Sequence, residues 1–110
     1  MADLNQLLRR LCDAEIEFVI VGGFAAVLHG STLVTRDLDV CTVLTDANVE
    51  RLRTGAVDFV TAVSGVGDFR KVYDQAVTIE PFGRSCRVMS LVDLIAAREL
   101  ESIAERLKTR

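Results

Sequence analysis

A short apolar run that ends in two glycines limits most strongly what this chain can fold into. The run 17-EFVIV-21 is β-branched or aromatic after its first residue, which is typical of a buried strand, and Gly22 and Gly23 end it. The segment 24-FAAVLHG-30 then predicts a short helix, which Gly30 ends. The sequence therefore predicts a strand followed at once by a helix, with a glycine pair at the junction.

The remaining segments predict further helices and strands. Helices are expected at about 3–14 and 46–53, at 69–75 as a short helix or irregular segment, and from Ser90 to about 107. Strands are expected at 38–44, 56–63, 76–80 and 84–89, the last two joined by a tight hairpin at 81–83. This order predicts one α/β (α+β) domain over 1–110, with a mixed sheet of about five strands and helices mainly on one face.

Two features predict apolar surface that needs cover. The apolar face expected for the last helix contains Leu91, Leu94, Ile95, Leu100, Ile103 and Leu107. Hydrophobic residues make up 50% of the chain, so some apolar surface of the protein is expected to be covered by a partner or a second copy.

Asp37 and Asp39 lie one residue apart at the start of the second predicted strand. Alternate residues of a strand point to the same face, so we expect the two carboxylates to project together. Such a pair repels itself unless a cation lies between the two groups. Oxygen ligands without His or Cys suit Mg²⁺ or Mn²⁺, and Mg²⁺ usually combines one or two carboxylates with substrate phosphates.

Asp58 is a third acid, within the otherwise apolar run 56-AVDFVTAV-63. An acid in a buried strand is costly unless it is paired or bound to a metal. If the second and third strands are neighbours, Asp58 lies beside Asp37 and Asp39, and three carboxylates can hold two metal ions about 3.5–4 Å apart for phosphoryl transfer. A structural role, in which Asp58 caps a turn or pairs with an arginine, stays open.

Gly22 and Gly23 offer a seat for phosphate groups. Because they have no side chains, a ligand can approach their backbone, and the helix that follows begins with free N–H groups. A triphosphate at this junction would share Mg²⁺ with Asp37 and Asp39.

The glycine pair, the Asp-x-Asp motif and the third acid together resemble the DNA polymerase beta-like nucleotidyltransferase superfamily. The stretch FVIVGGFAAVLHGSTLVTRDLDV looks like the small bacterial nucleotidyltransferase-domain proteins of the minimal and toxin–antitoxin types, and 76–100 resembles their closing hairpin and helix. The resemblance implies a nucleotidyltransferase-like fold, in a shortened form. It implies the following site residues: Gly22, Gly23, Thr35 and Arg36 for the phosphates, and Asp37, Asp39 and Asp58 as catalytic metal ligands, with Asp58 also a candidate general base.

The function implied is metal-dependent transfer of an NMP from an NTP, expected to be ATP, to a hydroxyl acceptor. The acceptor would be a protein side chain, an RNA end or a small molecule such as an aminoglycoside. The stretch between Asp39 and Asp58 is shorter than in the family pattern, which favours an alternative: a catalytically inactive nucleotide-binding or antitoxin-like module with the same fold, acting with a cognate toxin protein. A homodimer, through a sheet edge or an apolar helix face, fits both hypotheses.

Composition argues against several other classes of protein. The formal net charge is -3 and the basic residues are scattered, which disfavours a long nucleic-acid partner. No window approaches the ~18 consecutive apolar residues of a membrane span, and the first residues do not resemble a signal peptide. The odd number of cysteines, without a C-x-x-C motif, predicts free and mostly buried thiols in a cytoplasmic protein: Cys12, Cys41 and Cys86.

Five further residues have a structural and a functional interpretation. His29 is expected to pack or cap its helix rather than contact a ligand. Phe69 and Tyr73 are expected to pack in the core or an interface rather than stack on a base. Arg84 and Arg87 are expected on an exposed strand face rather than in an acceptor-binding patch.

Overall fold

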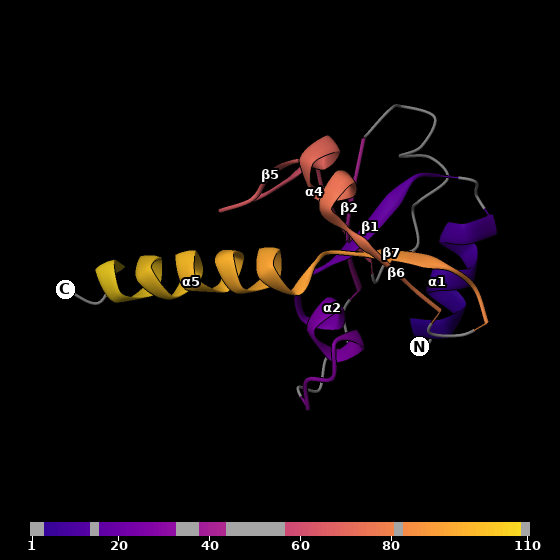
Figure 1. The fold of residues 1–110 in the computed structure, drawn as a ribbon, viewed down its shortest axis with the longest axis horizontal. Helices are drawn as coiled ribbons and strands as arrows, with labels where there is room; N and C mark the ends of the chain where they lie inside the picture. The colour runs from indigo at the N-terminus through magenta and orange to yellow at the C-terminus, as the bar shows by residue number, and fades with distance from the viewer. Residues whose placement is uncertain (1–3, 14–15, 33–37, 44–56, 81–82, 109–110) are drawn as a thin grey trace.

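The computed structural model describes residues 4–13, 16–32, 38–43, 57–80 and 83–108. Its helices are α1 (Leu4–Asp13), α2 (Gly22–Leu28), α4 (Phe69–Gln75) and α5 (Leu91–Lys108). Its strands are β1 (Phe18–Val21), β2 (Leu38–Thr42), β3 (Val57–Val60), β4 (Ala62–Val63), β5 (Gly67–Asp68), β6 (Val77–Ile79) and β7 (Cys86–Val88) (Figure 1). The helix predicted at 46–53 lies outside the described residues.

Five strands form one mixed sheet in the order β3-β2-β1-β7-β6. β1 is antiparallel to β2 and parallel to β7, β2 is parallel to β3, and β6 is antiparallel to β7. The predicted α/β class and the sheet of about five strands are therefore confirmed. The strand predicted at 56–63 is interrupted at Thr61, whose carbonyl accepts a hydrogen bond of 3.2 Å from the N–H of Phe69. Consequently β3 stays in the sheet, while β4 leaves it to pair with β5.

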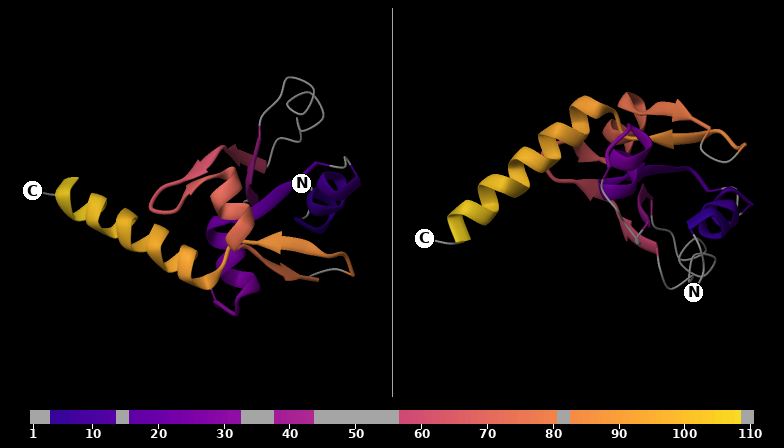
Figure 2. Two further views of the ribbon diagram at one scale, coloured as in Figure 1. Left: turned by 45° about the horizontal axis from the view of Figure 1, so that its top comes forward. Right: turned by 90° about the horizontal axis from the view of Figure 1, so that it is seen from below.

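Helices cover both faces of this sheet. All four residues of β1 are buried, so each face of this central strand needs a covering layer. α2 and α4 lie on opposite sides of the strands in Figure 1, and Figure 2 shows α5 running away from both of them. The arrangement is thus less one-sided than predicted, because α4 closes the second face with the buried side chains of Phe69 and Val72.

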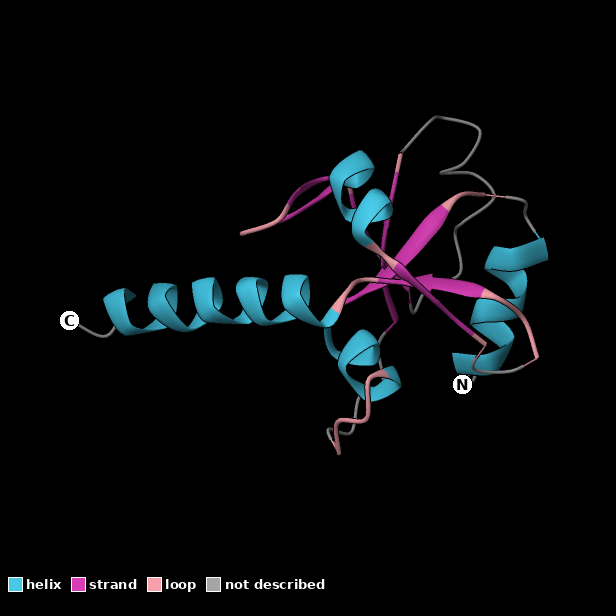
Figure 3. Ribbon diagram, in the orientation of Figure 1, coloured by secondary structure: helices cyan, strands magenta, loops and turns pink. Residues whose placement is uncertain are grey.

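α5 begins as predicted and then leaves the body of the protein. The Asp93 N–H donates to Ser90 Oγ at 3.1 Å, which is the expected N-terminal cap. Leu94 and Ala97 are buried, whereas Ile103 and Leu107 are 47% and 66% exposed. Figure 3 shows the rest of the helix projecting away from the sheet. The predicted apolar face is therefore only partly core, since Leu94 alone among its six residues is buried.

Asp93 also joins α5 to α4. With the amide of Gln75 oriented so that its nitrogen faces Asp93, that nitrogen donates to Oδ1 and Oδ2 at 2.8 and 2.7 Å. Asp93 is 9% exposed, so these bonds replace the water that its carboxylate loses on burial. None of the described helices is long and apolar enough to cross a membrane.

The three cysteines are free thiols, as predicted. Cys41 and Cys86 are buried, and Cys12 is half-buried. Burial, reinforced by the neighbouring thiol of Cys12, raises the pKa of Cys86 from 9.0 to about 12, although the Arg84 charge acts in the opposite direction. Because the folded-state pKa is the higher one, Cys86 contributes stability that is lost as the pH rises from about 9 towards 12.

Cys86 is expected to react with iodoacetamide much more slowly than Cys12 in the folded protein at pH 8. The reaction needs a thiolate and access, and Cys86 has little of either. Mass spectrometry of peptides after timed alkylation measures the two rates. Both thiols should react at similar rates in urea, and equal rates in the folded protein would contradict the prediction.

Candidate functional site

The junction of β1 and α2 places the glycine pair beside Asp39 of β2. The antiparallel register pairs Val21, the last residue of β1, with Asp39. Gly22 follows with φ +69°, and a Cβ at this position would lie 2.7 Å from Asp39 Oδ2. A side chain at position 22 would overlap the Asp39 carboxylate, so this position requires glycine. The backbone of Gly22 is therefore directly adjacent to the half-buried Asp39 side chain.

The parallel pairing of β2 with β3 brings a second acid to the same position in the sheet. The register pairs Asp39 with Asp58, which confirms the strand adjacency that the metal-site hypothesis requires. Like charges at opposed positions of neighbouring strands are destabilising, and a cation between them removes this cost. The structure describes the backbone of Asp58 only, and Thr35, Arg36 and Asp37 lie outside the described residues.

A cavity of about 440 Å³ opens beside Asp39 and the glycine pair. Its volume lies within the ~300–1,000 Å³ that is usual for sites of small molecules. Most of its lining residues are apolar and come from the ends of β1 and β3, from β4, from the connection between β7 and α5, and from the start of α5: Val21, Val60, Ala62, Val63, Met89, Leu94 and Ala97. The polar lining consists of Gly22, Gly23, Asp39, Ser64 and Arg98. The cavity thus has an acidic corner with open backbone, an apolar wall and one arginine.

Ser64 and Arg98 are cavity residues that the sequence pattern does not identify. Ser64 lies in the turn between β4 and β5, and Arg98 lies on α5. Neither belongs to a motif, because they reach the cavity only through the packing of two distant segments against the end of the sheet. Arg98 supplies a positive charge on the cavity wall, opposite in sign to Asp39.

His29 has the structural role that was predicted for it. It is the C-cap residue of α2, and its Nε2–H donates to the carbonyl of Met89 at 2.8 Å. The N–H of Met89 in turn donates to the carbonyl of Ile20 at 2.9 Å. These two bonds hold the connection between β7 and α5, and they therefore position the part of α5 that lines the cavity.

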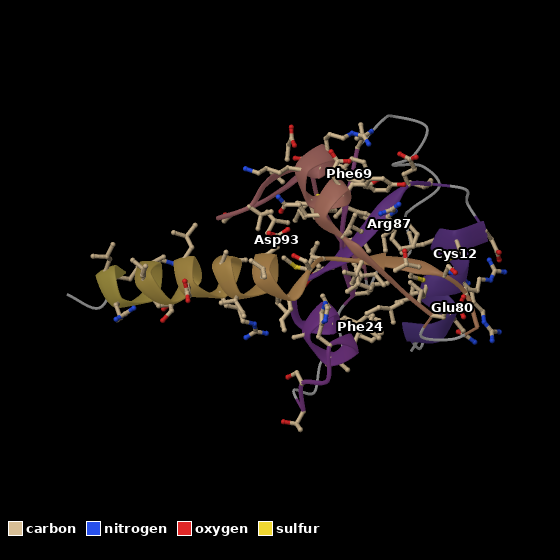
Figure 4. The ribbon with its side chains drawn as sticks, in the orientation of Figure 1. Cys12, Phe24, Phe69, Glu80, Arg87 and Asp93 are labelled. Atoms are coloured by element: carbon tan, nitrogen blue, oxygen red, sulfur yellow. The ribbon has the colours of Figure 1, made fainter. Side chains whose placement is uncertain are left out.

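The aromatic and arginine candidates lie elsewhere. Phe69 is buried, its ring centroid lies 5.4 Å from that of Tyr73, and the Arg87 guanidinium lies 4.1 Å from the Tyr73 centroid. The predicted packing role of the two aromatic rings is thus confirmed, and Figure 4 shows Phe69 and Arg87 on the α4 side. Arg84 is exposed as predicted, with an ion pair of 2.8 Å to Asp13, but Arg87 is half-buried against Tyr73 and not on an exposed face.

Carboxylate oxygens such as those of Asp39 suit a hard divalent cation. Asp39 carries two carboxylate oxygens, and Asp58 is its register partner in β3. Any side chain at position 22 would occupy the space beside the Asp39 carboxylate, which glycine does not fill. Among the side chains that the structure describes, no group of three or more His, Cys, Asp or Glu residues could hold a metal ion. The side chains of Asp37 and Asp58 are not among those described.

The chain matches none of the protein-family models, curated proteins or solved structures with which it was compared. Function is therefore inferred from the site itself, from its residue types and their arrangement.

Proposed function

We propose that this protein is a metal-dependent nucleotidyltransferase of the DNA polymerase beta-like superfamily, which moves an NMP from an NTP to a hydroxyl acceptor. The observation that carries the proposal is the juxtaposition of three predicted residues: the Gly22 backbone adjoins the Asp39 carboxylate, and Asp58 is the register partner of Asp39. Gly22 follows the end of β1, and Asp39 and Asp58 lie near the starts of β2 and β3, so three separate segments meet at one point, which supports a shared role.

Each predicted residue has a role in this proposal. Asp37, Asp39 and Asp58 would hold Mg²⁺ or Mn²⁺, while the backbone at Gly22 and Gly23 allows close approach of the triphosphate. When bound, the metal supplies charge neutralisation at the phosphates and activation of the attacking oxygen. Asp58 would accept the proton of the acceptor hydroxyl, and Thr35 and Arg36 would contact the triphosphate.

The size and lining of the cavity support a nucleotide as its ligand. The apolar wall formed by β3, β4 and α5 is suited to a base or sugar, while Arg98 offers a positive charge to an anionic group. ATP is the expected NTP, and the acceptor hydroxyl belongs to a protein, an RNA end or a small molecule.

The second candidate is a catalytically inactive nucleotide-binding or antitoxin-like module, which acts through a protein partner such as a cognate toxin. The observation that favours it is the exposed apolar side of α5, because surface of this kind is typical of protein interfaces.

A labelled-nucleotide assay distinguishes the two candidates. The protein is incubated with Mg²⁺ and each labelled NTP, with and without candidate acceptors, beside an Asp37→Ala/Asp39→Ala double variant and an EDTA control. Transfer that disappears in both controls supports the enzyme. Binding without transfer supports the inactive nucleotide-binding module. The absence of Mg²⁺-dependent NTP binding contradicts every version that uses a nucleotide and leaves only the antitoxin-like interaction module.

A further inference from the structure

The projecting part of α5 carries an exposed apolar stripe along one side of the helix. Ala96, Leu100, Ile103 and Leu107 follow one another at spacings of four, three and four residues, the pattern of a coiled-coil seam. Of the residues of α5 that pack on the body, Leu94 lies about 180° from Ile103 around the helix and Ala97 lies about 60° from Leu100, so the stripe runs beside the buried face of α5. Leu100, Ile103 and Leu107 are 42%, 47% and 66% exposed, so the stripe faces outward where other helices bury such residues.

The charges beside this stripe are self-complementary. Glu99 and Arg106 occupy the same heptad position, on one flank of the seam, and they differ in sign. When two copies of α5 pair in opposite directions, Glu99 of one copy faces Arg106 of the other, and the reverse contact forms as well. A parallel pair would instead set Glu99 opposite Ala104, without an ion pair.

We propose that α5 is a self-association surface, on which a second copy of this chain lays its own α5 in the antiparallel direction. The two-fold arrangement places Leu100 against Ile103 and Ala96 against Leu107, and each contact occurs twice. One exposed helix face buries an area near or below the low end of stable interfaces, so we expect a dissociation constant of about 1–100 µM. This inference does not depend on the proposed function.

Two matched substitutions on α5 test the apolar stripe. Ile103→Glu is expected to raise the dissociation constant at least ~10-fold, because it puts a charge in the middle of the seam. Ile95→Glu is the control: Ile95 is 49% exposed, close to the 47% of Ile103, but lies about 80° away around the helix. This control should change the constant less than ~2-fold. Sedimentation equilibrium measures the shift from 12.1 kDa to twice that mass, and circular dichroism verifies the fold of each variant.

A charge exchange tests the direction of pairing. Glu99→Lys and Arg106→Glu should each weaken self-association, because each sets like charges against one another across the two-fold axis. An equimolar mixture of the two variants should associate again, since the introduced lysine then faces the introduced glutamate and native Glu99 faces native Arg106. A wild-type chain that stays at 12.1 kDa at all concentrations, an Ile103→Glu variant that dimerises like the wild type, or a mixture no tighter than its components would each overturn the proposal.

Discussion

Replacement of Gly22 by alanine is expected to lower nucleotide transfer by about 100-fold or more, at only a modest cost in stability. The new Cβ would lie 2.7 Å from Asp39 Oδ2, so the carboxylate must move from the position that the proposed metal site requires. Gly22 also has φ +69°, a conformation that costs a residue with a side chain about 1–2 kcal/mol. Mg²⁺-dependent NTP binding, followed by calorimetry, should fall together with transfer.

Gly83→Ala is the matched control for this prediction. Gly83 has φ +75°, nearly the same conformation, but a Cβ there meets nothing within 4 Å. Both variants should therefore lose a similar amount of thermal stability, while only Gly22→Ala loses nucleotide binding. Normal binding by Gly22→Ala, or an equal loss in the Gly83 variant, would refute the assignment of the glycine pair to the site.

The second large effect is expected for Asp39→Asn, which should lower transfer at least ~100-fold and remove the stabilisation that Mg²⁺ provides. A ligand that binds only the folded protein stabilises it by about 2.7 kcal/mol at a hundred times its dissociation constant. We therefore expect Mg²⁺ with a non-hydrolysable NTP to raise the Tm of the wild type by several degrees, and to leave the Tm of Asp39→Asn unchanged.

Asp74→Asn serves as the control for the lost charge. Asp74 lies on α4, its side chain is 62% exposed, and it pairs with Arg70 at 3.8 Å, so its removal should affect neither transfer nor the Mg²⁺ response. If Asp39→Asn kept the Mg²⁺-dependent rise in Tm, Asp39 would not be a ligand. If it lost transfer but kept that rise, its role would be catalytic without metal binding.

Features that depend on a few neighbouring residues were predictable. The strand 17–21, the helix after it and the Ser90 cap of α5 follow from strand-forming side chains, backbone sterics and one short-range hydrogen bond. The local sequence pattern was misleading at 56–63, where an apolar run predicts one continuous strand but the structure has two, β3 and β4. The chain instead turns at Thr61, because the Thr61 carbonyl accepts a hydrogen bond from the N–H of Phe69 and the next two residues pair with β5.

The candidate site was predictable in its parts but not in its arrangement. Gly22, Asp39 and Asp58 were recognised by residue type, yet their proximity depends on β2 lying between β1 and β3 with one particular register. Arg98 and Ser64 gave no signal, since they reach the cavity only through the positions of α5 and the β4–β5 hairpin.

By itself the sequence indicated the candidate residues Gly22, Asp39 and Asp58 and where most strands and helices begin, because those properties arise from side chains and backbone within one or two turns of the chain. Only the tertiary structure decided that Gly22 and Asp39 touch, that α4 covers the second face of the sheet, and that half of α5 leaves the core. The reason is physical: strand order and helix placement are set by which apolar faces bury one another, and that choice joins segments far apart in the sequence.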